Sequence, residues 1–184
     1  LALKRAAVAE ARKVMGPAFR VEYEEPGVGE SSSNAFVERA IWEVQSMIRT
    51  LVFAAEEMHG EKTSLTHPCR LCAVVYAGQL LTRCQRSTSD GRTAWELRRG
   101  RPYKKMLPTF FEPILYLKVA VNKRRHKFDD RWSTALFAGL EDRTNEYRVI
   151  TPEGLFKVNC LKRLPVSQRK DPELFRSVRG TPVS

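Results

Sequence analysis

The sequence lacks any long hydrophobic run. No uninterrupted apolar stretch approaches the ~20 residues that a membrane-spanning helix requires, so we expect no membrane partner. Residues 1–15 also lack the apolar core and the small-residue cleavage site of a signal peptide. The chain begins with Leu1 rather than methionine, and we expect a soluble fragment of a longer protein. With 42% hydrophobic residues it still has ample material for a core.

Cysteine is sparse and shows no pattern of paired motifs. Because secretory features are missing, we expect reduced thiols rather than disulfides. The spacing His67-x-Cys69-x-x-Cys72, with Cys84 or His59 as a fourth ligand, would suit zinc. However, there is no second CxxC pair, and Cys69 and Cys72 fall in an apolar helical stretch where small hydrophobic residues fit. The four cysteines are Cys69, Cys72, Cys84 and Cys160.

Acidic residues are outnumbered by basic ones, 21 to 32, which gives a net charge of +11. The surplus is uneven, because residues 1–100 carry 14 basic and 12 acidic side chains while residues 101–184 carry 18 and 9. A basic carboxyl-terminal portion attracts phosphate backbones through counterion release. The same charge would also attract anionic lipid or simply remain solvated.

Hydrophobic periodicity predicts a mainly helical first part of the chain. The apolar stripe of the longest helix runs from Val37 to Ala55, and Ser33 or Asn34 could cap its first turn. Pro68 suits the first turn of the next helix, which is apolar nearly all round and so should be mostly buried. Charged and turn residues at 99–102 then suggest a domain boundary. The predicted elements are helices over 1–15, 34–58, 68–84 and 93–98 and a strand over 19–24.

The second part of the chain has the pattern of a small β-domain. Short runs rich in aromatic and branched residues alternate with turns, and Thr151–Gly154 reads as a tight hairpin turn. Strands at this spacing fit a small barrel of the SH3-like or chromo-like kind. The tail over 166–184 is polar, with little to bury. The predicted strands are 110–119, 132–140, 146–150 and 155–161.

The sharpest local motif is a carboxylate in the first turn of the long helix, directly after a loop rich in glycine and serine. Glu38, Trp42, Gln45 and Arg49 are spaced to share one helix face, where Glu38 could look into a cleft. Alternatively, Glu38 is an ordinary acidic residue stabilised by the helix dipole. From spacing alone the second interpretation is favoured, because one carboxylate does not make a metal site.

Residues 29–51, GESSSNAFVERAIWEVQSMIRTL, resemble the segment that carries the last acidic residue of retroviral and retrotransposon integrases. In that family the loop ends in Asn-Gly or Gln-Gly, and a glutamate follows within the first turn of a long helix. The downstream order is similar too: His67-Pro68 opens a helix, Asp90–Leu97 precedes Gly100-Arg101-Pro102, and a small basic β-domain follows. The resemblance is specific as an ordered series, although no single motif suffices.

The resemblance implies that residues 1–100 are the distal half of an RNase H-like α/β core, that 101–165 are the small barrel and that 166–184 are a tail. It implies two-metal phosphoryl transfer with Mg²⁺ or Mn²⁺ in the intact parent, and Glu38 matches the third metal-binding carboxylate. The two aspartates that should precede Glu38 are not in this chain. We therefore expect the fragment to be inactive as an enzyme and to bind no metal tightly by itself.

Two departures from the family pattern lie in the same segment. Ala35 replaces the family glycine, and Trp42 and Gln45 stand where the family often has basic residues that grip DNA. Asn34, Arg39 and Arg49 remain candidates for DNA contact. Arg39 could equally form a solvated ion pair with Glu43, four residues away.

The best predicted DNA-binding surface is the basic turn of the β-domain, with clustered charge and nearby aromatic residues. A solvated basic hairpin would show the same composition. The resemblance favours DNA, because the carboxyl-terminal domain of integrases is a DNA-binding barrel. A chromo-like barrel could instead read a histone tail in an aromatic cage, but no set of cage residues is identifiable. The predicted contact residues here are Lys123, Arg124, Arg125, Lys127, Arg131, Lys162 and Arg163.

The sequence therefore predicts a fragment of a retrotransposon polyprotein that acts in DNA integration. By the resemblance its partners are element-end and target DNA and further copies of itself, and its location is nuclear, or otherwise cytoplasmic. The alternative is a non-catalytic nucleic-acid or chromatin-binding module, or a retroelement relic in which only the barrel functions.

Overall fold

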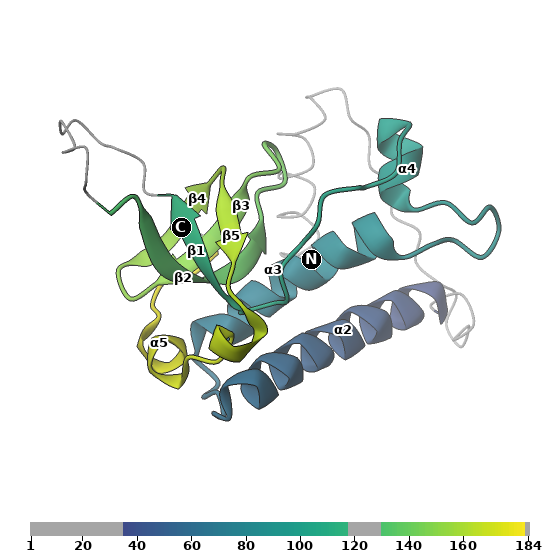
Figure 1. Cartoon of the computed structure of the whole chain (residues 1–184). Coiled ribbons are helices and arrows are strands. Elements are labelled where there is room, and N and C mark those ends of the chain that lie inside the picture. The colour runs from purple at the N-terminus through teal and green to yellow at the C-terminus, as the bar shows by residue number, and fades with distance from the viewer. Residues whose placement is uncertain (1–34, 118–129, 183–184) are drawn as a thin grey trace, which may run out of the picture. The chain divides into compact units, whose positions relative to one another are not determined.

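The computed structural model of the chain describes residues 35–117 and 130–182 (Figure 1). The chain divides into two compact units, 1–39 and 40–184, and apart from residues 35–39 the description below concerns the second. The predicted helix over 1–15 and the predicted strand over 19–24 lie outside the described residues. Within the described ranges, no helix has the length and apolar character needed to cross a membrane.

Three helices stand where periodicity predicted them. The side chain of His67 accepts a hydrogen bond from the backbone N–H of Cys69 and caps the second helix, whose first residue is a proline. Thr93 and Glu96 cap the third reciprocally, each side chain accepting the other's backbone N–H. The helices are α2 (Ala35–His59), α3 (Pro68–Cys84) and α4 (Ala94–Arg99).

The carboxyl-terminal part forms one antiparallel sheet of five strands in the order β4-β3-β2-β1-β5. The mixed helix-and-sheet class and the four predicted strands are confirmed. The fifth strand is additional: the predicted strand over 155–161 breaks at residues 159–160, and the chain then returns to pair with β1. The strands are β1 (Pro113–Leu117), β2 (Trp132–Leu140), β3 (Tyr147–Thr151), β4 (Gly154–Val158) and β5 (Leu161–Arg163).

A hairpin turn and a register shift define the strand pairing of the sheet. Thr151 pairs with Gly154 across the β3–β4 connection, so the predicted hairpin turn is confirmed. The register of β2 against β3 shifts between Phe137 and Gly139, where Gly139 has a φ of +124°. A Cβ at Gly139 would lie 3.1 Å from the ring of Tyr76, so the glycine permits the close approach of α3 to the sheet.

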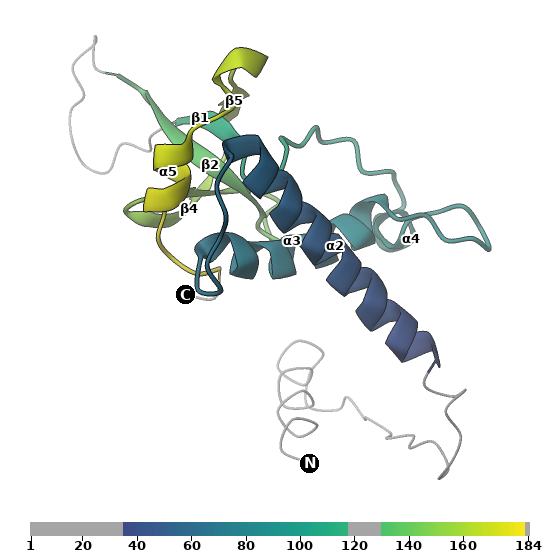
Figure 2. The ribbon, with the colours of Figure 1, turned by 90° about the horizontal axis from the view of Figure 1, so that it is seen from below.

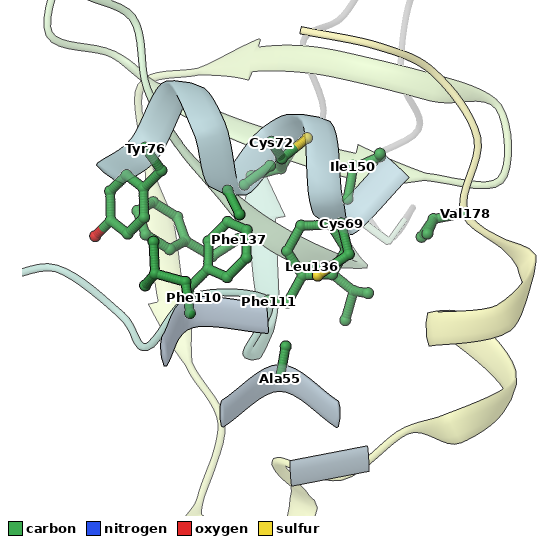
Figure 3. Packing of buried hydrophobic residues seen from close by; sticks show 14 of the residues in the cluster. Ala55, Cys69, Cys72, Tyr76, Phe110, Phe111, Leu136, Phe137, Ile150 and Val178 are labelled. Atoms are coloured by element: carbon green, nitrogen blue, oxygen red, sulfur yellow. The ribbon is translucent and has the colours of Figure 1, made fainter. Parts of the chain in front are cut away.

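Helix α3 packs against this sheet through an aromatic cluster (Figure 3). The ring of Tyr76 stacks on Phe110 and meets Phe137 edge-on, with 5.5 Å between centroids in both pairs. The amide of Gln79 donates to the carbonyl oxygen of Leu140 at 2.7 Å and accepts its N–H at 3.0 Å. Residues of α2 and α3 thus share one hydrophobic cluster with the sheet, across the predicted boundary at 99–102.

The prediction that α3 is mostly buried does not extend to one side of the helix. Leu71 and Val74 keep 45% and 51% of their surface exposed. Together with Phe53 of α2 they line a small cavity of about 300 Å³. The apolar residues of α3 therefore exceed what the sheet and α2 cover.

The expectation that residues 166–184 have little to bury is also wrong. A short helix, α5 (Pro172–Ser177), places Phe175 in the core with 1% of its surface exposed. Its ring stacks on His59 at 4.5 Å between centroids and lies 4.9 Å from His67. Figure 2 shows α5 beside the sheet and near the carboxyl end of α2. One buried aromatic in a polar segment is enough to anchor this tail.

Candidate nucleic-acid interface

The first candidate region is the amino-terminal part of α2. Glu38 and Arg39 are exposed in its first turn, and farther along the helix Gln45 and Arg49 are exposed as well. Asn34 lies outside the described residues. Within residues 35–117 and 130–182, no group of three or more His, Cys, Asp or Glu side chains could hold a metal ion. The roles of Glu38 as metal ligand and of Arg39 and Arg49 as DNA contacts stay predictions.

Of the residues considered for zinc, Cys69, Cys72 and His67 are occupied within the fold, whereas Cys84 is exposed. Burial raises the pKa of the Cys69 thiol strongly and that of Cys72 to about 12, which disfavours the thiolate that a metal needs. Both ring nitrogens of His67 have protein partners: Nε2 donates to the carbonyl oxygen of Phe175 at 2.9 Å, and Nδ1 accepts the N–H of Cys69 at 3.2 Å. These contacts hold α3 and α5 together.

The basic run between β1 and β2 in the sequence was the main prediction for DNA binding. Lys123, Arg124, Arg125 and Lys127 all lie outside the described residues, so this part of the surface remains a prediction. The described ends of the two strands, Leu117 and Trp132, are paired neighbours in the sheet.

Two of the predicted contact residues lie beside that end of the sheet. Arg131 is exposed directly before β2. Lys162 on β5 is exposed, and its Nζ lies 4.4 Å from the centroid of the Trp132 ring. The structure therefore brings Arg131 next to a Lys162–Trp132 pair, a combination of positive charge and an aromatic face that suits contact with a nucleic-acid backbone.

Arg163, the neighbour of Lys162, forms an ion pair within the fold, and its contact with DNA stays a prediction. Its Nε and Nη2 donate to the two carboxylate oxygens of Glu112 at 2.8 and 2.6 Å, and Glu112 is fully buried. Burial alone would raise the pKa of Glu112, but hydrogen bonds from Arg163 and from the backbone N–H of Thr109 outweigh it and hold the pKa below its usual range. Arg169 Nε lies 3.1 Å from the same carboxylate. Arg163 thus anchors β5 to the segment before β1.

A second basic cluster, around Trp95 on α4, was not predicted from the sequence. Its arginines come from three separate segments, which only the fold brings together. The visible signal was the run from Arg98 to Lys105, in which five of eight residues are basic, but its turn residues suggested a boundary instead. The arginines of this cluster are Arg83, Arg98, Arg99 and Arg143.

Comparisons of this chain with protein-family models, with curated proteins and with solved structures found no match. Three features of the chain itself bear on its function: the ordered motifs, the basic carboxyl-terminal portion, and the charged and aromatic residues at one end of the sheet.

Proposed function

We propose that this chain is the distal part of a retroelement integrase and that its β-sheet domain binds DNA without sequence preference. The observation that carries the proposal is the strand order, in which a four-stranded meander is followed by a fifth strand that returns to β1. This is the connectivity of small SH3-like barrels. It occurs after the integrase-like series of motifs, at the place where the resemblance implies such a domain.

In this proposal the DNA lies against the end of the sheet that carries Arg131, Trp132 and Lys162. The basic run over 123–127 joins the two strands at this end and would extend the surface. Lys and Arg side chains of this kind neutralise phosphates and carry no base information, so the affinity should depend on salt and tolerate any sequence.

The enzymatic role belongs to the intact parent. Two-metal phosphoryl transfer needs several carboxylates around the ions, and Mg²⁺ or Mn²⁺ would supply the Lewis acid there. Here Glu38 stands alone, because the first aspartate of the sequence is Asp90, well after it. The described residues do not fit a metal pair, and we derive no catalytic step from this chain.

The DNA-binding part is tested by neutralising the basic run in the full 184-residue chain. We expect Lys123, Arg124, Arg125 and Lys127 changed together to Gln to weaken binding of a labelled duplex by about tenfold or more at low salt, because several phosphate contacts are lost. Fluorescence anisotropy measures the affinity. The charge-matched control changes Lys4, Arg5, Arg12 and Lys13 to Gln and should bind much more tightly than the test variant. Equal affinities for the two variants would rule out the basic run as the DNA contact.

The integrase part is tested in a chain extended upstream along its parent reading frame, where the two aspartates should lie. We expect this longer protein to join DNA strands in the presence of Mg²⁺, and we expect Glu38→Gln to reduce the rate by at least about a hundredfold, because a metal ligand is lost. Glu57→Gln, at an exposed position of the same helix, is the control. An upstream sequence without aspartates, or an active Glu38→Gln variant, would leave a binding module as the function.

A further inference from the structure

A cavity of about 510 Å³ lies between α3, α4 and the turn after β2. Arginines dominate its charged lining: Arg83 from α3, Arg98 and Arg99 from α4, and Arg143 from the turn. Among the described residues Asp142 is the one carboxylate in the lining, so the charged side chains there carry a net charge of +3. The cavity is therefore a solvent-open concentration of positive charge within the second unit.

Arg83 is the buried member of this group, with 5% of its surface exposed. Its hydrogen bonds are long: Nη1 donates to the carbonyl oxygen of Gln79 and Nη2 to the carboxylate of Asp142, both at 3.3 Å. Its Nε–H is buried and finds no acceptor within residues 35–117 and 130–182. Asp142 is itself 66% exposed. A buried guanidinium held by one exposed carboxylate is poorly compensated, because solvent screens the carboxylate and not the cation.

Trp95 orders two of the arginines. The guanidinium carbons of Arg83 and Arg99 lie 5.0 and 5.2 Å from the centroid of its ring. Trp95 is held in turn by the ring of Tyr103, which meets it edge-on at 5.2 Å. Cation–π contacts of this kind position guanidinium groups without using their N–H donors, which remain available to a ligand.

We propose that this cavity is a binding site for a phosphate group. Guanidinium forks match the tetrahedral oxygens of phosphate and bind them through paired, charge-assisted hydrogen bonds. The ligand would add a second negative charge beside Arg83, whose carboxylate partner Asp142 is exposed. Its phosphate comes either from a free phosphate compound or from a nucleic-acid backbone. The site shares no residue with the proposed DNA-binding surface and does not rest on that proposal.

The test uses the full chain with Arg98, Arg99 and Arg143 changed together to Gln. All three are exposed, so this variant should keep the fold, whereas a change at buried Arg83 could lose it. The charge-matched control changes Lys170, Arg176 and Arg179 to Gln, in and around α5, which lies away from α4 in Figures 1 and 2. Isothermal titration calorimetry at low salt measures two probes separately: inorganic pyrophosphate, and a short single-stranded oligonucleotide without terminal phosphates.

We expect the arginine variant to bind at least one probe about tenfold or more weakly, because two or more charge-assisted hydrogen bonds are lost. The control variant should keep the affinity of the unchanged chain for that probe. Loss of pyrophosphate binding alone identifies a free phosphate ligand, and loss of oligonucleotide binding alone identifies a backbone phosphate. Equal affinities of the arginine variant and the control for both probes would overturn the site. The variant of the basic run over 123–127 should keep its pyrophosphate binding, so failure of this site and failure of the proposed function give different results.

Discussion

At the residue scale, Glu112 shows most clearly how this fold uses charge. Its carboxylate is fully buried and receives two hydrogen bonds from Arg163, with Arg169 close by. Such a site is costly to break, because removal of the carboxylate leaves cations beside a desolvated space. The network joins the segment before β1 to β5 and to the chain that follows it.

We expect Glu112→Ala to lower the free energy of unfolding by about 2–3 kcal/mol, because charge-assisted hydrogen bonds from the partly exposed Arg163 are lost. Urea denaturation followed by circular dichroism measures the change. Glu57→Ala, on the exposed side of α2, should shift stability by no more than about 0.5 kcal/mol. A cost below about 1 kcal/mol for Glu112→Ala would contradict the structural role assigned to Arg163.

Residue roles were the least predictable feature. Lys162 and Arg163 are adjacent and equally basic, and the sequence assigned both to DNA. Because side chains alternate along β5, Lys162 contacts Trp132 and Arg163 contacts Glu112. The burial of Glu112 depends on residues that are distant in the sequence. Likewise, Arg83 and Arg143 are sixty residues apart in the sequence but line the same cavity, which no local sequence pattern predicts.

At the element scale, α5 is held by two histidines from the helices. His59 Nε2 donates to the carbonyl oxygen of Phe111 and its Nδ1 accepts the N–H of Asp171, while His67 Nε2 donates to the carbonyl oxygen of Phe175. Each arrangement requires a neutral ring. Burial lowers the pKa of both histidines below their ordinary value of 6.5, although the hydrogen bonds and nearby acidic groups act in the opposite direction.

The lowered pKa values of His59 and His67 predict that the folded state loses stability as the pH falls. Because the unfolded histidines bind protons more readily, the contribution is fully present above pH 6.5 and is lost as the pH falls through the folded pKa values. The melting temperature should therefore fall between pH 7.5 and pH 5.5. His67→Asn, which keeps a helix-capping side chain, should show a smaller fall. A melting temperature that stays constant or rises on acidification would contradict this account of α5.

Elements with strong local signals were predictable, and those fixed by distant contacts were not. The capping pair Thr93 and Glu96 marks the first turn of α4, and the hairpin turn before Gly154 predicts the start of β4. Strand β5 has only three residues and follows β4 after a short break, so its pairing with β1 left no periodic trace. Helix α5 is held by the packing of Phe175 against His59 and His67. This packing site exists only once the core has assembled, so the local sequence does not predict it.

At the scale of the whole molecule, the second unit is a single hydrophobic cluster with a strongly basic surface. Helix α3 lies against the sheet, and residues of α2 and α5 complete the cluster. The predicted domain boundary rested on the turn residues at 99–102; the chain bends at residues 100–101, and residues on both sides of the bend belong to one hydrophobic cluster. The charge, by contrast, could be read from the sequence, since 18 of the 32 basic residues lie after residue 100.

The central claim is that this chain binds DNA through its backbone phosphates. The most direct test is the affinity of the full chain for two unrelated duplexes across a salt series, measured by fluorescence anisotropy. If Arg131, Lys162 and the four residues of the basic run each neutralise one phosphate, a plot of log affinity against log salt should have a slope of about −5 for both duplexes. A slope near zero, or a strong preference for one duplex, would contradict the claim.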